Sequence, residues 1–199
     1  AMSTGVARET RLYKRVGESN IREALEMVST ANISDAMHRS GDLPGLRPVM
    51  PGIRMAGPVV TVRTYPGDWA KPVEAIDVAG EGDVIVIDAG GRPPAMWGEL
   101  ATQSAIQRKI AGIAADGGVR DTPEIIRLGF PAWASVVTPT AGEPKGFGEI
   151  NVPIKIGGVR ICPGDWAVGD DDGVVIVPKA RAAEFANRAM DVLEKENRL

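Results

Sequence analysis

Apolar positions along the first third of the chain fall into two spacings, which predict two helices followed by a strand. Residues 19–29 place apolar side chains at helical spacing, with Ser19 as a candidate N-cap. A second short helix is predicted over 33–40, ending at Gly41. The β-branched run at 58–64 predicts the first strand.

The middle of the chain alternates between strand and helix patterns, with glycine-rich loops between them. The run VIVIDA at 84–89 is apolar on both faces, which is typical of a buried strand. The elements predicted after it are a helix at 97–110, a strand at 112–116, a helix at 123–128 and a strand at 131–137. This order favours parallel strands joined by right-handed crossovers.

The last quarter of the chain is richer in strands. Residues 151–178 predict short strands joined by tight turns, and 179–197 predict a helix. The sequence PGDWA occurs twice, at 66–70 and at 163–167, each time after a predicted strand. Pro presets the backbone and Gly-Asp turns it, so the simplest interpretation is one turn used twice rather than an internal duplication.

Composition places the chain among globular α/β domains. It has 199 residues, 44% of them apolar, and a net charge of −3 without a basic block, so we expect no nucleic-acid partner. Since no linker divides it, we expect one domain over 1–199, with 1–18 as an N-terminal extension and Ala1 as a tag remnant. Cys162 and His38 are the only residues of their types, which excludes an internal disulfide and a multi-histidine metal site within one chain.

Two further classes are excluded by the distribution of apolar residues. No uninterrupted apolar run approaches the roughly 18 residues of a membrane helix. Residues 1–15 lack the apolar core of a signal peptide. We therefore expect a cytoplasmic protein with no membrane partner.

The first stretch that could carry chemistry is AGGRPPAMWGEL at 89–100. Asp88 ends the predicted strand, and a glycine loop leads to a helix that starts at Gly98 and Glu99. Backbone N–H groups at a helix start favour an anion such as a carboxylate or phosphate. The stretch lacks the GK[ST] of a phosphate loop, and a plain strand-to-helix connection explains it equally well.

The second stretch is ADGGVRDT at 115–122, where Arg120 and Asp121 stand just before the next helix. Both stretches leave the C-terminal ends of consecutive parallel strands, the edge at which open α/β sheets bind ligands. Arg120 could donate two parallel hydrogen bonds to a carboxylate, and Asp121 could supply an oxygen ligand to Mg²⁺ or Mn²⁺. An Arg–Asp surface turn remains an equal alternative.

Other polar features are better explained by structure than by chemistry. The three acids at 170–172 precede Gly173 between two predicted strands, which is typical of a hairpin and lacks the spacing of an EF-hand. His38, among polar neighbours, is expected at the surface or at an interface, and Cys162 in the core. No Ser lies in a G-x-S-x-G elbow, and no Lys lies in the glycine loops for a Schiff base.

Taken together, these motifs resemble the regulator of ribonuclease activity A superfamily. The resemblance rests on GDVIVIDAGG, WGELA, GIAADGGVRD and FPAWA, followed by NVPIKIGGVRICPGDWAVGDDDGVVIVP, and it covers about 20–197. The catalytic branch of that superfamily contains 4-hydroxy-4-methyl-2-oxoglutarate and 4-carboxy-4-hydroxy-2-oxoadipate aldolases. The resemblance implies a single-domain β/β/α sandwich similar to the swivelling phosphohistidine domains.

The resemblance also implies roles for individual residues. The similar aldolases carry an acidic residue, twenty further residues and then Arg-Asp, which Glu99, Arg120 and Asp121 match here, although that acid is often Asp. Asp121 matches the direct metal ligand, and Arg120 the residue that binds the substrate carboxylate or keto oxygen. Gly98, Glu99 and Leu100 match the loop whose backbone N–H groups hold the pyruvyl carboxylate. Glu99 and Asp35 match acidic positions near the metal waters. Glu196 or Glu194 matches a glutamate that reaches the site of a neighbouring subunit.

The function implied by the resemblance is class II aldol cleavage of a 4-hydroxy-2-oxo diacid to pyruvate and a second 2-oxo acid. It implies Mg²⁺ or Mn²⁺ as cofactor, oxaloacetate decarboxylation as a side activity, and a homotrimer or hexamer with sites between subunits. The rival is a non-catalytic, protein-binding regulator of ribonuclease activity, which needs no metal. That branch typically lacks the acid after the Arg, so Asp121 favours catalysis.

Overall fold

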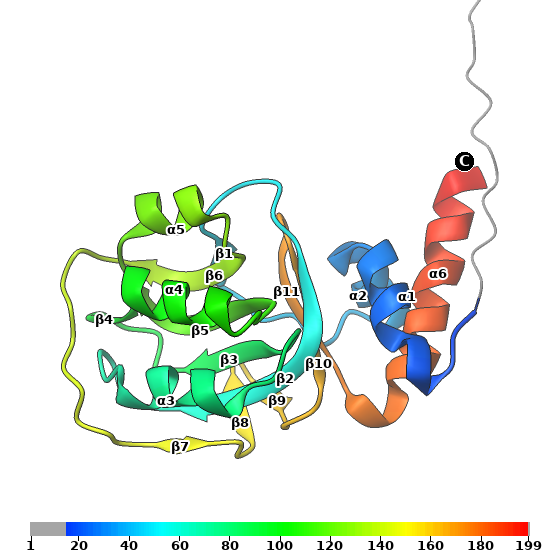
Figure 1. Cartoon of the computed structure of the whole chain (residues 1–199). Coiled ribbons are helices and arrows are strands. Elements are labelled where there is room, and N and C mark those ends of the chain that lie inside the picture. Colours follow the sequence, from blue (N-terminus) through cyan, green and yellow to red (C-terminus); the bar gives the residue numbers. More distant parts are fainter. Residues whose placement is uncertain (1–14, 199) are drawn as a thin grey trace, which may run out of the picture.

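A nine-stranded sheet forms the body of the molecule in a computed structural model that describes residues 15–198 (Figure 1). The strands in spatial order are β1 (Arg47–Pro48), β6 (Ala132–Val137), β5 (Gly112–Val119), β3 (Val84–Asp88), β2 (Met55–Arg63), β10 (Trp166–Asp170) and β11 (Gly173–Val177). Two short strands join from the side, β4 (Ala95–Trp97) on β5 and β7 (Glu149–Ile150) on β2.

The centre of the sheet is parallel, as the alternating order of strands and helices predicts. β2, β3, β5 and β6 run in one direction, with Val86 paired to Thr61 on one side and to Ala114 on the other. Their C-terminal ends therefore lie at one edge of the sheet, where the loops that carry the candidate residues leave it.

Side chains of the central strands alternate between two cores. Val84 and Val86 face a core inside the curled sheet, whereas Ile85 and Ile87 face a second core beneath the helices. This period of two is what strands buried on both faces require. Over the parallel strands the arrangement gives two layers of strand and one covering layer of helix, so the expected α/β class and β/β/α layering are confirmed for this part of the molecule.

The chain segment at 41–48 nearly closes the sheet into a barrel. Leu43 donates its backbone N–H to Val174 in β11 at 2.9 Å, and Gly41 accepts from Ile176 at 2.9 Å. A few residues later, Arg47 in β1 pairs with Ala134 in β6. One short stretch thus bridges the two ends of the sheet.

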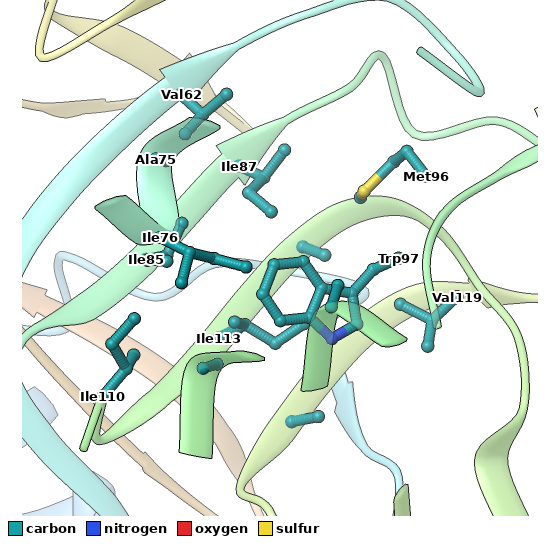
Figure 2. Packing of buried hydrophobic residues seen from close by; sticks show 14 of the residues in the cluster. Val62, Ala75, Ile76, Ile85, Ile87, Met96, Trp97, Ile110, Ile113 and Val119 are labelled. Carbon is teal, nitrogen blue, oxygen red and sulfur yellow. The ribbon is translucent and has the colours of Figure 1, made fainter. Parts of the chain in front are cut away.

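Three helices cover the outer face of the parallel strands (Figure 1). They are α3 (Ala70–Val78), α4 (Glu99–Gln107) and α5 (Thr122–Leu128). Figure 2 shows the indole of Trp97 in the core beneath them, among Ile113, Val119 and Met96. Trp97 is 3% exposed, donates its ring N–H to Thr102 and stacks on Phe130, which fixes the chain just before α4.

The remaining helices pack as a separate layer against β10 and β11 (Figure 1). These are α1 (Ile21–Met27), α2 (Thr30–Ala36) and α6 (Ala182–Arg198), accompanied by 3₁₀ turns at Glu18–Asn20 and Lys179–Arg181. Arg15 forms ion pairs with Asp191 and Glu194 of α6, so this part of the predicted N-terminal extension docks on the layer. The part of the extension at 1–14, with Ala1, lies outside the described residues.

The C-terminal strands are also as predicted. β8 (Ile154–Ile156) and β9 (Val159–Ile161) form a two-stranded hairpin of their own, and β10 and β11 pair in antiparallel register. Within 15–198 no helix has both the length and the apolar character to cross a membrane.

Several predicted boundaries are wrong. Ser19 lies in a 3₁₀ turn instead of capping α1, whose N-cap is Asn20. The helix predicted over 33–40 begins earlier, because the Ser29 side chain caps α2 at Asn32, and it ends at Ala36. The helix expected from residue 97 begins at Glu99, since the segment before it pairs with β5 as β4.

The glycine pair expected to form a loop after residue 116 lies inside β5 instead. A Cβ on Gly117 would come within 2.8 Å of Ala89 Cβ, and one on Gly118 within 2.8 Å of the Pro94 carbonyl. These glycines let neighbouring segments approach closely and do not turn the chain.

Candidate active site

The two candidate stretches meet at the edge of the sheet, because β4 and β5 run parallel and end together. Trp97 pairs with Val119, and the Arg120 backbone N–H donates to the Trp97 carbonyl at 3.0 Å. Gly98 and Asp121 then follow side by side, each as the N-cap of a helix. The sequence prediction that these two loops lie together is confirmed.

The Asp121 carboxylate serves the neighbouring helix and not its own. Its backbone is left-handed, with φ of 58°, and its side chain forms no cap hydrogen bond with α5. Instead Oδ2 accepts the Glu99 backbone N–H at the start of α4, at 3.1 Å. The positive end of a helix therefore holds this carboxylate in place.

Gly98 is the residue that permits this contact. A Cβ at this position would stand 2.8 Å from Asp121 Oδ2 and 3.4 Å from Arg120 Cγ. Its φ of −160° is open to any residue, so the need for glycine here is a need for space.

Arg120 and Asp121 carry opposite charges side by side at the rim. Arg120 Nε lies 3.9 Å from Asp121 Oδ2, and the two side chains are 44% and 38% exposed. A pair this exposed stabilises the fold by at most about 1 kcal/mol. Both groups thus remain available to a ligand.

The Glu99 carboxylate contacts its own helix and α5. Oε1 accepts from the Gln103 amide at 3.2 Å and lies 3.9 Å from the Arg127 guanidinium on α5. The side chain is 33% exposed. It borders the site without contacting Asp121 through its carboxylate.

A cleft of about 370 Å³ contains these groups. Its polar end is formed by Gly98, Glu99, Arg120 and Asp121, and the rest of its lining is largely apolar. Leu100 is 80% exposed there, with Trp69 at 39% and Val73 at 38%. A small anion would find a cation and helix N–H groups at one end and apolar walls around them.

The cleft walls include residues that the sequence did not reveal. Trp69 and Val73 come from the start of α3, a helix absent from the sequence prediction, and Ala141 comes from the long connection after β6. The spacing of Val73, Ile76 and Val78 resembles a helix only weakly. Ala141 carries no signal in the sequence.

The other acids expected near the metal lie elsewhere in the same chain. Asp35, on α2, borders a separate hollow with His38 and Arg39, whereas Glu196 accepts the Asn32 side-chain amide at 3.0 Å. Glu194 pairs with Arg15. All three belong to the helical layer, on the far side of β10 and β11 from α4 (Figure 1). Their predicted role near the site therefore needs a second subunit and stays a prediction.

The acidic run at 170–172 is a hairpin, as predicted. Asp170 accepts from the Thr30 backbone and hydroxyl at 2.9 and 2.7 Å, which ties α2 to the β10–β11 turn. Asp171 accepts the Gly52 N–H at 2.7 Å. These carboxylates are occupied in holding the backbone.

Asp88, at the end of β3, does not line the cleft. It borders another hollow with Arg63 and Lys155. Burial raises the pKa of its carboxyl above the ordinary value, against a hydrogen bond from Gly90 N–H that lowers it, and the nearby Asp116 charge raises it further. The cleft therefore involves the end of β5 and the start of α4, and not the end of β3.

The donor set at the cleft suits a hard divalent cation. Within 15–198 no group of three or more His, Cys, Asp or Glu side chains is arranged to hold a metal ion. Mg²⁺ commonly takes one or two protein carboxylates and completes its shell with water and substrate oxygens. The Asp121 carboxylate, exposed at the cleft and fixed by one N–H, fits that pattern.

Comparison with known proteins agrees with this architecture. The sequence pattern of the RraA-like family, described as Aldolase/RraA, matches residues 30–176. The chain belongs to the RraA-like family. The match spans the sheet and the cleft, so the resemblance inferred from the sequence motifs is confirmed.

Relatives within the RraA-like family carry two kinds of name. A Halalkalibacterium halodurans protein, 38% identical over 81% of this chain and 78% of its own, is provisionally named 4-hydroxy-4-methyl-2-oxoglutarate aldolase. A Thermus thermophilus protein named 4-hydroxy-4-methyl-2-oxoglutarate aldolase is 33% identical over 75% of this chain and 92% of its own. The solved structure of a Streptomyces coelicolor protein, described as an unusual member of the RNase ES inhibitor RraA protein family, is 30% identical with a TM-score of 0.81, over 92% of this chain and 96% of that one.

Proposed function

We propose that this chain is a divalent-metal-dependent aldolase that cleaves a 4-hydroxy-2-oxo diacid to pyruvate and a second 2-oxo acid. The observation that carries the proposal is the Asp121 carboxylate, held at the start of α4 beside the Arg120 guanidinium in a cleft sized for a small ligand. Aldolase names among the relatives support the same reaction.

Asp121 is the residue that would hold Mg²⁺ or Mn²⁺. When bound, the ion would supply Lewis-acid polarisation of the substrate carboxylate and keto oxygens. The Glu99 N–H and the backbone around Gly98 fix the carboxylate, so it needs no reorganisation to meet the cation.

Arg120 would bind the substrate and stabilise the developing charge. Its guanidinium, 44% exposed at the rim, can donate two parallel N–H bonds to a carboxylate or to the C2 oxygen. As the C3–C4 bond breaks, negative charge grows on that oxygen, and a donor already in place favours the transition state over the ground state. Because the Glu99 N–H donates to Asp121, the other first-turn N–H groups of α4, which have no acceptor inside the helix, would bind the pyruvyl carboxylate.

Proton transfer would depend on Glu99. A water held by its carboxylate would take the proton from the C4 hydroxyl, which becomes the carbonyl of the second product. The C3–C4 electron pair passes to the pyruvate enolate, and a proton returned at C3 completes pyruvate. Oxaloacetate would lose CO₂ through the same enolate, so decarboxylation should accompany cleavage.

Oxaloacetate decarboxylation provides the test. We expect pyruvate formation by the purified chain with Mg²⁺ or Mn²⁺, its loss on adding EDTA, and its return with excess metal. Asp172→Asn, which changes an exposed acid in the β10–β11 turn, is the matched control for substitution of Asp121. Equal rates with metal and with EDTA would contradict the proposal.

The rival function is that of a protein-binding regulator of ribonuclease activity. The specific observation in its favour is the structural similarity to the Streptomyces coelicolor RNase ES inhibitor relative. Inhibition of a ribonuclease that persists in EDTA and in Asp121→Asn, together with no metal-dependent turnover, would favour this rival.

A further inference from the structure

The two PGDWA copies share a feature that a simple turn does not require. In each copy the Asp is buried, Asp68 at 3% exposure and Asp165 at 8%. Each carboxylate accepts backbone N–H groups from a segment distant in sequence. The motif therefore forms a turn whose buried carboxylate also ties two chain segments together, an arrangement here called a carboxylate staple.

The first staple ties α3 to the connection after β6. Asp68 Oδ1 accepts from the N–H groups of Ala70, Lys145 and Gly146 at 3.1 to 3.2 Å, and Oδ2 accepts from Phe147 at 2.9 Å. Burial alone would raise the pKa of this carboxyl, but the four N–H groups lower it below the ordinary value. The ionised form is thus the one that the fold binds.

The segment held in this way, residues 138–148, is here called the strap. Its other half is fixed to the strand that leads into the cleft, because Ala95 donates to Thr140 at 2.8 Å and accepts from Gly142 at 2.9 Å. A Cβ on Gly142 would overlap the Gly67 carbonyl, so the strap lies directly on the first PGDWA turn.

The strap and the turn together form one wall of the cleft. Ala141 of the strap lines it, and so does Trp69, the residue after Asp68. Ala95, which is hydrogen-bonded to the strap on both sides, precedes Gly98 by three residues. Loss of the staple would therefore move both the wall and the approach to the α4 start.

We propose that Asp68 is a positioning residue for the cleft: its carboxylate fixes the strap against Ala95 and Trp69 and so sets the wall of the ligand site. The expected effect of Asp68 on the reaction rests on the proposed aldolase function. Its expected effect on the backbone around the cleft does not. Asp68 touches no ligand group itself and acts through Ala141 and Trp69.

The second PGDWA copy provides a matched control. Asp165 accepts from Cys162 N–H at 2.8 Å and from Lys179 N–H at 2.9 Å, which ties the end of β9 to the turn that precedes α6. It lies in the same motif and is similarly buried, but the segments that it ties together do not line the cleft. Asp165→Asn therefore removes a comparable staple from another part of the fold.

The experiment compares Asp68→Asn with Asp165→Asn in the full chain by amide hydrogen exchange and by kinetics. Asn keeps one acceptor oxygen and turns an N–H₂ toward the remaining donors, so the Phe147 N–H or its neighbours lose a partner. In Asp68→Asn we expect faster exchange at 138–148 and at 95–101. We expect kcat/KM for oxaloacetate with Mg²⁺ to fall about tenfold, mainly through KM, since a displaced wall weakens binding before and during reaction alike. In Asp165→Asn both readouts should match the wild type, despite a lower Tm.

A milder variant covers the case in which Asp68→Asn does not fold. Thr64→Val removes a hydroxyl that bonds the Phe147 carbonyl at 3.1 Å and the Asp68 carbonyl at 3.3 Å, and it should loosen the strap in the same direction.

Unchanged exchange at 95–101 in the folded variant, or equal kinetic losses in Asp165→Asn, would overturn the proposal. If the wild type shows no lyase activity, the proposed function fails, and the exchange results still decide whether Asp68 positions the cleft.

Discussion

Asp121 Oδ2 lies only 2.8 Å from the position that a Cβ on Gly98 would take. The carboxylate thereby comes close enough to accept the Glu99 N–H at the start of α4. Two residues that are 23 positions apart thus fix the position of one carboxylate oxygen, because the parallel strands β4 and β5 end side by side.

Gly98→Ala should damage the site without disturbing the fold. The φ of −160° accepts alanine, so the cost to the free energy of unfolding is about 1 kcal/mol, as for a poorer N-cap residue. The added methyl displaces Asp121, and we expect metal-dependent oxaloacetate decarboxylation to fall at least about tenfold. Gly80→Ala is the control, since its Cβ would meet only Asp83 Oδ2, at 3.5 Å. Wild-type turnover and metal response in Gly98→Ala would contradict this account.

Asp121→Asn should separate chemistry from stability. Asn tolerates the left-handed backbone at φ of 58°, whereas Ala there costs about 1–2 kcal/mol. We therefore expect Asp121→Asn to keep the wild-type Tm, Asp121→Ala to lose a few degrees, and both to lose metal-dependent turnover. Thermal denaturation with the decarboxylation assay checks both parts, and near wild-type turnover in either variant would remove Asp121 as a metal ligand.

Much of the strand layout could be predicted because the strands are long, β-branched and buried. The VIVIDA run predicts a central strand, and β3 holds Val84–Asp88 in the middle of the sheet. That the loops after residues 89 and 116 leave one edge of the sheet follows from the parallel order, but the contact of Gly98 with Asp121 also depends on β4, which the sequence did not predict.

What the sequence did not reveal depends on contacts between distant segments. Gly117 and Gly118 resemble a turn in the local sequence, yet they lie in β5. Glycine is needed there because Ala89 and the Pro94 carbonyl approach so closely that a side chain would not fit. The helix α3 begins with Lys71-Pro72 in its first turn, a pattern that also suits a loop. The staple role of Asp68 depends on residues 145–147, which no local pattern links to it.

The chain should assemble into a homotrimer or hexamer. Leu100 at 80% exposure and Trp69 at 39% leave apolar surface around the cleft, and burial of such surface against another copy is favourable. Light scattering at micromolar concentration should give a mass three or six times 21.0 kDa. A monomer with full activity would contradict this prediction and the role assigned to a neighbour's acid.

Acid should weaken the Asp68 staple in a defined direction. The folded pKa of Asp68 lies below its ordinary value, near 3.9 in an unfolded chain, so the unfolded state binds the proton more readily. Its contribution to stability is present above the unfolded pKa and is lost as the pH falls through the folded pKa. We expect the Tm difference between wild type and Asp68→Asn to be largest near neutral pH and to shrink below about pH 4. A difference independent of pH would show that the charge of Asp68 is unimportant.

Arg120→Lys tests whether the guanidinium takes part in the reaction or only orders its loop. Lys keeps the charge but loses the planar pair of donors that a carboxylate or enolate oxygen requires. If that contact strengthens as the C3–C4 bond breaks, kcat should fall about 10²-fold or more, the effect of about 2.7–4 kcal/mol that is typical of one lost oxyanion donor. Metal affinity should change little, because Asp121 and not Arg120 is the proposed metal ligand. Since the Arg120–Asp121 pair is exposed, Tm should also stay within a few degrees. Steady-state kinetics on oxaloacetate at saturating Mg²⁺ separate these roles: a lower kcat at an unchanged Tm supports a place for Arg120 in the transition state, and an unchanged kcat removes it from the mechanism.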